Sequence, residues 1–451
     1  MENVNELGTE KIWKLFFKYS LPAIAGMIVY ASYNIVDRIF VGRGVGTLAI
    51  SGITVTFPML IIFMAFGMLV GMGATALISI KLGEKKVHEA ELVFGNALVL
   101  TSFLSVILIS IAYFFMDDIL IILGGSGQVL IYARDYLRVL LVGAVFQQIA
   151  FSMNGIIRAD GSPKIAMISM LISSVLNIIL NPIFIFVLHW GIRGSAWATV
   201  ISQCVSFIWV VAYFQGSKSF MKIRIKNLRL NYKIIMGIFA IGISPFILQI
   251  SGSIVNLLFN MGVAKYGGDI GLAVIGIGNT IIMFLLMPIF GINQGIQPII
   301  GYNYGAKQYD RVIKILWIGI LGASSICLIG FIAIILFSES ILGIFSKNDI
   351  RLVNLGSHGL RILMLMLPII GFPIIISNFF LSIGKAKNSM ILSLSRQVLL
   401  LMPLLIILPK FFALEGIWMS EPIADLIAAI IALILIVKEM KQLNEHKEMI
   451  L

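Results

Sequence analysis

Long apolar stretches, separated by short polar segments, run along the whole chain. Each stretch has about 20 residues or more, the length at which an α-helix crosses the ~30 Å hydrocarbon core of a bilayer. The pattern therefore predicts an all-α integral membrane protein with about twelve membrane helices. In the first half these are roughly 15–40, 53–80, 92–115, 137–157, 165–187 and 195–215, and in the second half 234–263, 271–300, 313–337, 359–381, 389–408 and 417–437.

The two halves repeat one another. Residues about 10–215 and about 233–437 carry the same landmarks in the same order, at an offset of 221–223. The landmarks pair as Pro22 with Pro245, Arg138 with Arg361, Gly161 with Gly384, Trp197 with Trp418, and the run 76–83 with 298–305. Many secondary transporters are built from such repeats, as two bundles that face each other across a cavity. We expect a V-shaped molecule of two six-helix bundles.

Charge confirms the class and sets the orientation. Charged residues make up 12% of the chain, against roughly 25% in soluble domains. The net charge of +12 is better explained by basic cytoplasmic loops than by nucleic-acid binding. By the bounds above, 22 of the 33 Lys and Arg residues fall on one side of the membrane and 7 on the other. Both termini are expected in the cytoplasm, and six helices per half make the repeats parallel, with a pseudo-twofold axis along the membrane normal.

The predicted domains follow from the one long polar connection, residues 216–233. Residues 1–215 form the first bundle, 216–233 a basic cytoplasmic linker, and 234–451 the second bundle with a cytoplasmic tail. The segment before the first helix is acidic and has no basic cluster, so that helix is expected to serve as its own insertion signal. Cys204 and Cys327 lie far apart in apolar segments, and neither a disulfide nor a metal site is expected.

Asp37 is the first candidate functional residue. A carboxylate within a membrane helix costs about 2.5–3.5 kcal/mol to insert, so it is expected to have a partner or a function there. It can pair with Arg38 or an interfacial donor, although neighbouring residues on a helix point about 100° apart. Alternatively it faces the bundle interior and takes up a proton or Na⁺, because a carboxylate at low dielectric exchanges protons near neutral pH.

Helices 5 and 6 offer partners for Asp37. Asn177 and Asn181 stand at i and i+4, on one face of helix 5, just before Pro182, and Thr199 lies in helix 6. Carboxylate, carbonyl and hydroxyl oxygens suit a hard cation such as Na⁺. Ordinary hydrogen bonding between helices is the competing explanation.

The second half carries a different polar set. Arg396 lies in helix 11, and Glu421 and Asp425 stand at i and i+4 in helix 12. An Arg–carboxylate pair within the second bundle relieves the cost of both charges. A direct role in coupling or substrate binding is the alternative.

Several functions are not supported by the sequence. No Gly-rich phosphate loop with its Lys is present, which argues against ATP hydrolysis. The four histidines are scattered, and no Ser-His-Asp arrangement or catalytic carboxylate pair stands out. We therefore do not expect an enzyme or a bound cofactor. A channel or a membrane enzyme is the alternative from a different functional class.

Four stretches together resemble the multidrug and toxic compound extrusion (MATE) transporters, over essentially the full chain. They are Ser20-Leu21-Pro22, Asn34-Ile35-Val36-Asp37 followed by Phe40-Val41-Gly42, Arg158-Ala159-Asp160-Gly161-Ser162-Pro163-Lys164, and Gln297-Pro298-Ile299-Ile300-Gly301-Tyr302-Asn303-Tyr304-Gly305-Ala306. The resemblance implies a cation-coupled antiporter that exports organic, often cationic, compounds. It implies drug-like small molecules and the bilayer as partners, no nucleic acid, and location in the cell membrane. We expect a monomer.

The resemblance also implies roles for individual residues. In one branch of the family the coupling site is in the N-terminal bundle, at positions matching Asp37, Asn177 and Thr199. Its second helix-5 position is commonly Asp and is Asn181 here, which favours a proton over Na⁺ on Asp37. The drug cavity of relatives is lined at positions matching Tyr33 and Asn154, and Asn177 is a further candidate. Another branch keeps an acidic residue near the position of Ser253, where this chain has none.

The closest rival function is a lipid-linked oligosaccharide flippase of the same superfamily. Such a protein is expected to hold several Arg or Lys residues in its cavity to bind a pyrophosphate. Here only Arg396 lies well inside a helix, which favours the antiporter.

Overall fold

The computed structural model describes residues 2–346 and 350–448, and these residues form helices and no strands. The elements are α1 (Glu2–Thr9), α2 (Ile12–Gly44), α3 (Thr47–Gly83), α4 (Val87–Phe114), α5 (Met116–Ile122), α6 (Gly127–Ala159), α7 (Pro163–Pro182), η1 (Ile183–Val187), α8 (Gly191–Gln215), η2 (Ile225–Asn227), α9 (Tyr232–Gly305), α10 (Tyr309–Ser346), α11 (Ile350–Leu363), α12 (Leu367–Ser382), α13 (Ala386–Leu394), η3 (Ser395–Leu401), α14 (Met402–Ile407) and α15 (Pro409–Glu448).

Ten helices in the described part of the chain are long and apolar enough to cross a membrane, and a pair bent by 45°, α11 with α12, makes an eleventh. Two of the ten belong to α9, which breaks at Gly268 (φ 57°), a conformation open to glycine. The twelfth predicted segment, 417–437, lies within α15. Several helices extend beyond the predicted bounds, because polar residues at the membrane surface continue a helix without adding to its apolar run.

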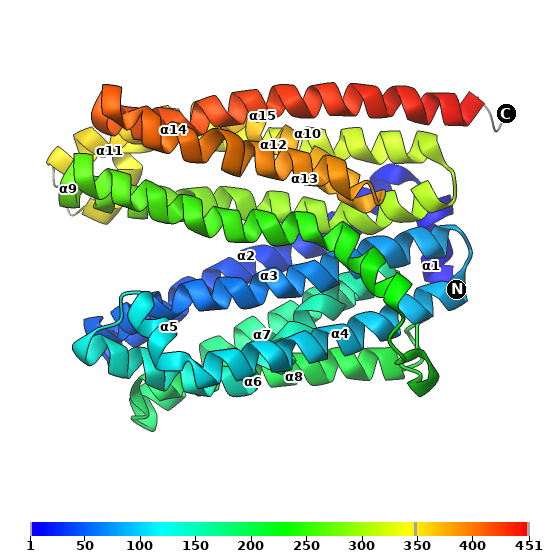
Figure 1. Ribbon diagram of the computed structural model, residues 1–451, viewed down its shortest axis with the longest axis horizontal. Coiled ribbons are helices and arrows are strands. Elements are labelled where there is room, and N and C mark those ends of the chain that lie inside the picture. The colour runs from blue at the N-terminus through cyan, green and yellow to red at the C-terminus, as the bar shows by residue number, and fades with distance from the viewer. Residues whose placement is uncertain (1, 347–349, 449–451) are drawn as a thin grey trace.

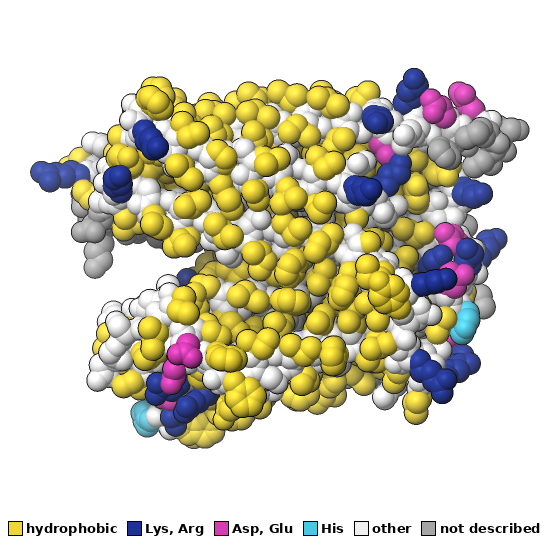
Figure 2. All heavy atoms as spheres, in the orientation of Figure 1, with side chains coloured by type: hydrophobic (Ala, Val, Ile, Leu, Met, Phe, Trp, Pro, Cys, Tyr) yellow, Lys and Arg dark blue, Asp and Glu magenta, His cyan; other side chains and the backbone are white. Residues whose placement is uncertain are grey.

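The helices form two groups that lie side by side (Figure 1). We call α2–α8 the N-terminal half and α9–α15 the C-terminal half. The space-filling view shows the molecule hollowed between the halves at the end far from the termini (Figure 2). We call this opening the cleft. At the other end the halves are in contact, and many of the Lys and Arg side chains in this view lie there.

Glycines allow the two halves to touch at the closed end. A side chain at Gly83 would run into the backbone carbonyl of Tyr302, and one at Gly305 into that of Ile80. The two contacts are equivalent under the repeat, because Gly83 corresponds to Gly305 and Ile80 to Tyr302 at an offset of 222. A pseudo-twofold relation between the halves requires this equivalence. We call this contact between α3 and α9 the seam. Small residues let helix backbones approach closely in membranes, so the seam closes one end and leaves the cleft at the other.

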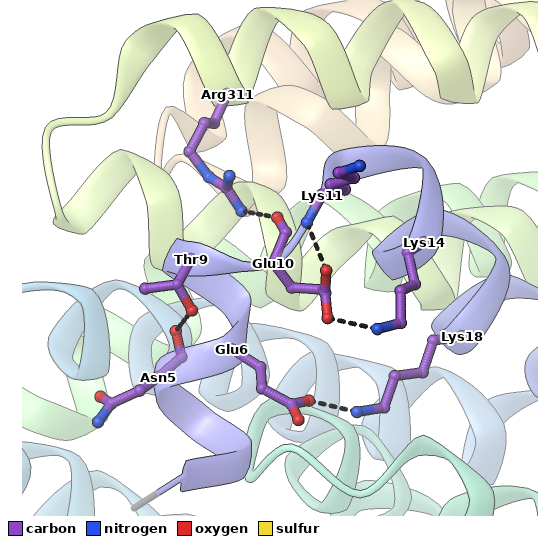
Figure 3. Close-up of polar contacts among 8 residues, drawn as sticks. All are labelled: Asn5, Glu6, Thr9, Glu10, Lys11, Lys14, Lys18 and Arg311. Atoms are coloured by element: carbon purple, nitrogen blue, oxygen red, sulfur yellow. Dashed lines mark hydrogen bonds and ion pairs between the residues drawn. The ribbon is translucent and has the colours of Figure 1, made fainter.

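The N-terminal helix α1 crosses from the N-terminal half to the C-terminal half at this closed end (Figure 3). Leu7 is fully buried. Arg311 of α10 donates through Nη2 to the Leu7 carbonyl (3.0 Å) and the Glu10 carbonyl (2.8 Å). Lys14 and Lys18 of α2 pair with Glu10 and Glu6. A guanidinium at the C-terminal end of a helix satisfies its free carbonyls and complements its dipole, so α1 ties both halves together.

We expect Arg311→Ala to release α1 from the C-terminal half. Hydrogen bonds from a charged donor each contribute about 1.5–3 kcal/mol, so the loss of this side chain should expose the chain around Lys11 at least about tenfold more often. Limited trypsin digestion of the purified protein measures this change as the rate of cleavage after Lys11. Lys314→Ala, an exposed change on the same helix, is the matched control, and equal cleavage in both variants would contradict the prediction.

Asp160, which follows α6, holds the start of the linker between the halves. Its carboxylate accepts hydrogen bonds from Tyr213 Oη (2.6 Å), Ser219 Oγ (2.8 Å), and the backbone N–H groups of Phe220 (3.0 Å) and Met221 (3.1 Å). Burial raises the pKa of Asp160 from 3.8 to about 6, although these hydrogen bonds oppose the rise. The carboxyl group therefore binds a proton in the folded protein over a pH range in which the unfolded chain has released it.

This raised pKa fixes the sign of a pH effect on stability. The contribution of Asp160 is fully present below pH 4, falls as the pH rises through about 6, and changes by about 3 kcal/mol in all. Asp160→Asn does not titrate, so its melting temperature should lie furthest below that of the natural protein near pH 4.5 and closest to it at pH 7. Thermal melts of both proteins across this range test the prediction, and a gap that widens with pH would refute it.

Candidate functional site

Asp37 of α2 lies inside the N-terminal half, with 8% of its surface exposed. Its Oδ1 atom accepts a hydrogen bond from Ser195 Oγ of α8 at 2.8 Å. Asn181 of α7 donates to the same oxygen through Nδ2. Three helices thus meet at one carboxylate.

A second set of hydrogen bonds supports the groups that hold Asp37. Asn177 Nδ2 donates to Thr199 Oγ1 at 3.0 Å, and its Oδ1 accepts from Asn181 Nδ2 at 3.4 Å. Thr199 Oγ1 in turn donates to the Ser195 carbonyl at 3.1 Å. The structure therefore brings Asp37, Asn177, Asn181 and Thr199 into one polar group.

Helix periodicity explains this convergence. Asn177 and Asn181 are four residues apart on α7, and Ser195 and Thr199 are four residues apart on α8, so each pair shares one helix face. After Pro182, which has no N–H to donate, α7 continues into the π-helical turn η1. Turns of this kind inside α-helices are frequent at functional sites.

Arg38 does not neutralise Asp37. Its guanidinium lies 5.6 Å from the ring centre of Phe57 on α3, as a cation–π contact. Within the described residues, no Lys, Arg or His side chain forms an ion pair with Asp37, so the sequence alternative in which Asp37 pairs with Arg38 is not what the structure has. The groups in direct contact with the Asp37 carboxylate are hydrogen-bond donors, from Ser195 and Asn181.

One oxygen beside Asp37 lacks a hydrogen-bond donor. Asn181 Oδ1 is buried and has no hydrogen-bond partner. Buried polar atoms are normally satisfied, and the exceptions often mark a position for a proton, ion or water. A protonated Asp37 can donate to such an oxygen, and a cation can be coordinated by it. Since no group of three His, Cys, Asp or Glu side chains in residues 2–346 and 350–448 could hold a metal ion, a cation here would rely on one carboxylate and neutral oxygens.

The residues expected to line the substrate cavity occupy different surroundings. Tyr33 lies one turn before Asp37 on α2, half-buried, with its ring 5.3 Å from that of Tyr30. Asn154 of α6 instead donates to Ser169 Oγ at 2.7 Å and accepts from Arg158. Asn154 thus belongs to a hydrogen-bond group between α6 and α7 that is separate from the one around Asp37.

In the C-terminal half, Arg396 and Asp425 form an ion pair, with Nε and Oδ1 2.5 Å apart. Asp425 is buried, with 2% of its side chain exposed. Glu421, one turn earlier on α15, makes no hydrogen bond in the described structure and stands outside this pair.

Sequence reasoning missed Ser195. Its signal was present, because Ser195 stands four residues before Thr199 and therefore on the same face of helix 6. A lone serine in a membrane helix is common and inexpensive, so spacing alone did not set it apart from other serines.

Both halves of the chain match one known protein family. The MatE family model matches residues 22–183 and again residues 245–407, one match in each half. The multidrug export protein MepA of Staphylococcus haemolyticus is 28% identical over 438 residues, covering 97% of this chain and 96% of that protein. MepA of Staphylococcus aureus strain MRSA252 is 29% identical over 425 residues, covering 94% and 93%.

Solved structures agree over nearly the whole chain. The MATE multidrug transporter DinF-BH, solved in complex with a dye, superposes with a TM-score of 0.90 at 38% identity, covering 96% of each chain. An outward-facing multidrug resistance MATE transporter of the MOP superfamily superposes with a TM-score of 0.90 at 26% identity, covering 99% of each chain.

Proposed function

The chain belongs to the MATE family of membrane transporters, which are not enzymes, and we propose that it is a cation-coupled multidrug efflux antiporter. Its substrates are organic, often cationic, drug-like compounds. This substrate class is supported by the multidrug export proteins that it resembles over 93% or more of their length. Transport alternates access to a cavity between residues 1–215 and 234–451, which act as two bundles joined by the linker 216–233.

The buried, unpaired carboxylate of Asp37 carries this proposal. It receives donors from α7 and α8 but no basic side chain, so its charge can be neutralised by an incoming cation. When Asp37 is ionised, the N-terminal half favours a cationic substrate. Cation uptake removes that charge, shifts α2 against α7 and α8, and releases the substrate. Antiport needs only that cation and substrate bias one conformational equilibrium in opposite directions.

The open cleft corresponds to the outward-facing state. Both termini and the seam lie at the end that we assign to the cytoplasm, on the basis of the excess of Lys and Arg in those segments. The cleft then faces outside, where the substrate leaves and the coupling cation enters. The structural similarity to an outward-facing MATE transporter supports this assignment.

A proton is the preferred coupling cation. The site has one carboxylate, and the second helix-5 position is the neutral Asn181. Na⁺ would need Asp37 together with the oxygens of Asn177, Asn181 and Thr199. A proton needs only Asp37 as its acceptor and the free Asn181 Oδ1 to receive the resulting O–H.

Proteoliposomes test the function and the cation together. Purified protein is reconstituted, and accumulation or release of a fluorescent cationic dye is followed under an imposed pH gradient or an imposed Na⁺ gradient, one at a time. We expect an imposed pH gradient to drive the dye in the direction opposite to the protons. An imposed Na⁺ gradient alone should drive little dye movement. Dye movement that ignores both gradients would reject antiport, and dye movement with Na⁺ alone would reject the proton.

A further inference from the structure

A small polar cavity lies inside the C-terminal half, outside the Asp37 site. Its volume is about 150 Å³. Its polar wall consists of Asn256 and Asn279 of α9, Arg396 and Gln397 of η3, and Glu421 of α15. Drug-like molecules occupy pockets of roughly 300–1,000 Å³, so this space suits an ion with a few waters and not a drug.

The charges around the cavity do not balance. Arg396 is paired with the buried Asp425 at 2.5 Å, which leaves the carboxylate of Glu421. The charged groups that act on Glu421 are Asp425 and Arg396, one of each sign. On the other elements packed against α15, His358 of α11 is bonded to Glu415 at 3.3 Å, Arg361 lies near Glu339, and Lys385 is bonded to Glu439 at 2.7 Å. Glu421 is therefore the charge on the cavity wall that has no ion-pair partner among the described residues.

The carboxamide residues that line the cavity with Glu421 have oxygens without donors. Gln397 Oε1 is buried and has no hydrogen-bond partner. Within the described residues, Asn256 and Asn279 also make no side-chain hydrogen bond. Carboxylate and carboxamide oxygens together form a ligand set for a hard cation, whereas an anion would find only Arg396, which Asp425 already occupies.

Asn256 and Asn279 also mark the entrance. Both are exposed, although they lie within the apolar spans of α9. An exposed carboxamide in a membrane helix is expected to face a water-filled space and not lipid. The cavity therefore has a route to water through these two residues.

The duplication gives this cavity a counterpart in the N-terminal half. At an offset of 221–223, Thr199 corresponds to positions 420–422, which include Glu421. Asn34, one turn before Asp37, corresponds to positions 255–257, which include Asn256. The segment Ser395–Leu401 is π-helical, as is the turn that follows Asn177 and Asn181 in α7. Both halves thus carry one free carboxylate among carboxamides beside a π-helical turn, on the first helix in one half and the last in the other.

We propose that this cavity is a second monovalent-cation site, in which one proton or one Na⁺ neutralises Glu421. The oxygens of Asn256, Asn279 and Gln397 complete the site around a bound Na⁺ or around the water beside a bound proton. Occupation leaves the three charged groups with no net charge, and removal of the cation leaves a net charge of −1. The binding site stands independently of transport, whereas its part in coupling rests on the function proposed above.

Equilibrium binding in the full-length Asp37→Asn protein isolates this site, because that change removes the carboxylate of the other half. One arm measures ²²Na⁺ binding by scintillation proximity. The other records infrared difference spectra between acid and alkaline pH, in which a protonated carboxyl group gives its own C=O band. Glu421→Gln is added to the Asp37→Asn background, and Glu415→Gln, an exposed change on the same helix, is the matched control.

We expect either a saturable ²²Na⁺ signal in Asp37→Asn that falls to background with Glu421→Gln, or an infrared C=O band that Glu421→Gln removes from the bands of the other carboxyl groups. In either arm the signal persists with Glu415→Gln. The ²²Na⁺ arm identifies Na⁺ as the occupant, and the infrared arm identifies a proton. Signals that are equal in both arms with and without Glu421→Gln would overturn the proposal. Neither arm uses a drug or a gradient, so failure of this site is distinguishable from failure of drug export.

Discussion

Asp37→Asn should abolish gradient-driven dye efflux while leaving the protein folded. Asparagine has the shape of aspartate but cannot ionise, so the N-terminal half stays in its neutral form whatever the cation gradient. Coupling between two ligands commonly amounts to 1–3 kcal/mol, or up to about 150-fold in affinity, and all of it should be lost here. We expect the initial rate of pH-driven dye movement in proteoliposomes to fall by about 100-fold.

A second readout separates lost coupling from lost folding. The Asp37→Asn protein should still exchange unlabelled for labelled substrate across the membrane when no gradient is imposed, because exchange needs no change in the charge of Asp37. Asp135→Asn is the matched control, since Asp135 lies in the same half and forms an exposed pair with Arg193 at 2.8 Å. If Asp37→Asn exports dye at the normal rate, Asp37 is not the coupling residue.

Gly305→Leu should prevent α3 and α9 from meeting at the seam. A side chain at this position meets the Ile80 carbonyl, a backbone atom that cannot rotate away as a flexible side chain would. Overpacking costs about 1–3 kcal/mol, which shifts a two-state equilibrium by about 5- to 150-fold. The state with a closed seam depends on this contact, so the ratio of closed to open molecules should fall by that factor.

The population can be followed at Ser79, which lies in the seam with 1% of its surface exposed. In a Cys204→Ala/Cys327→Ala background, a cysteine introduced by Ser79→Cys should react with a maleimide at least about fivefold faster when Gly305→Leu is present. Gly276→Leu is the matched control on the same helix, because a side chain there meets open space. Equal labelling rates in the two variants would show that the seam does not hold the closed end together.

The membrane helices and the repeat could be recognised along the chain because both are properties of local sequence. Apolar runs of sufficient length mark each bilayer crossing wherever the helices end up. The landmarks at an offset of 221–223 indicated two equivalent halves. The cost of a charge in a membrane helix singled out Asp37 as a residue that needs a partner. These inferences require no knowledge of which helices are neighbours.

Contacts between helices needed the tertiary structure, because they depend on which faces meet. Sequence alone did not show that Ser195 reaches Asp37, or that Arg38 turns to Phe57 instead. It proposed a pair between Arg396 and one of two carboxylates, and only the fold chose Asp425 and left Glu421 on a cavity wall.

The chain by itself therefore determined the number of halves, the approximate spans and the acid on the first membrane helix, since each is written in consecutive residues. The tertiary structure decided which donors surround that acid, which glycines close one end, and which carboxylate stays unpaired. Those outcomes arise between different helices, where a small rotation of a helix about its axis exchanges one partner for another.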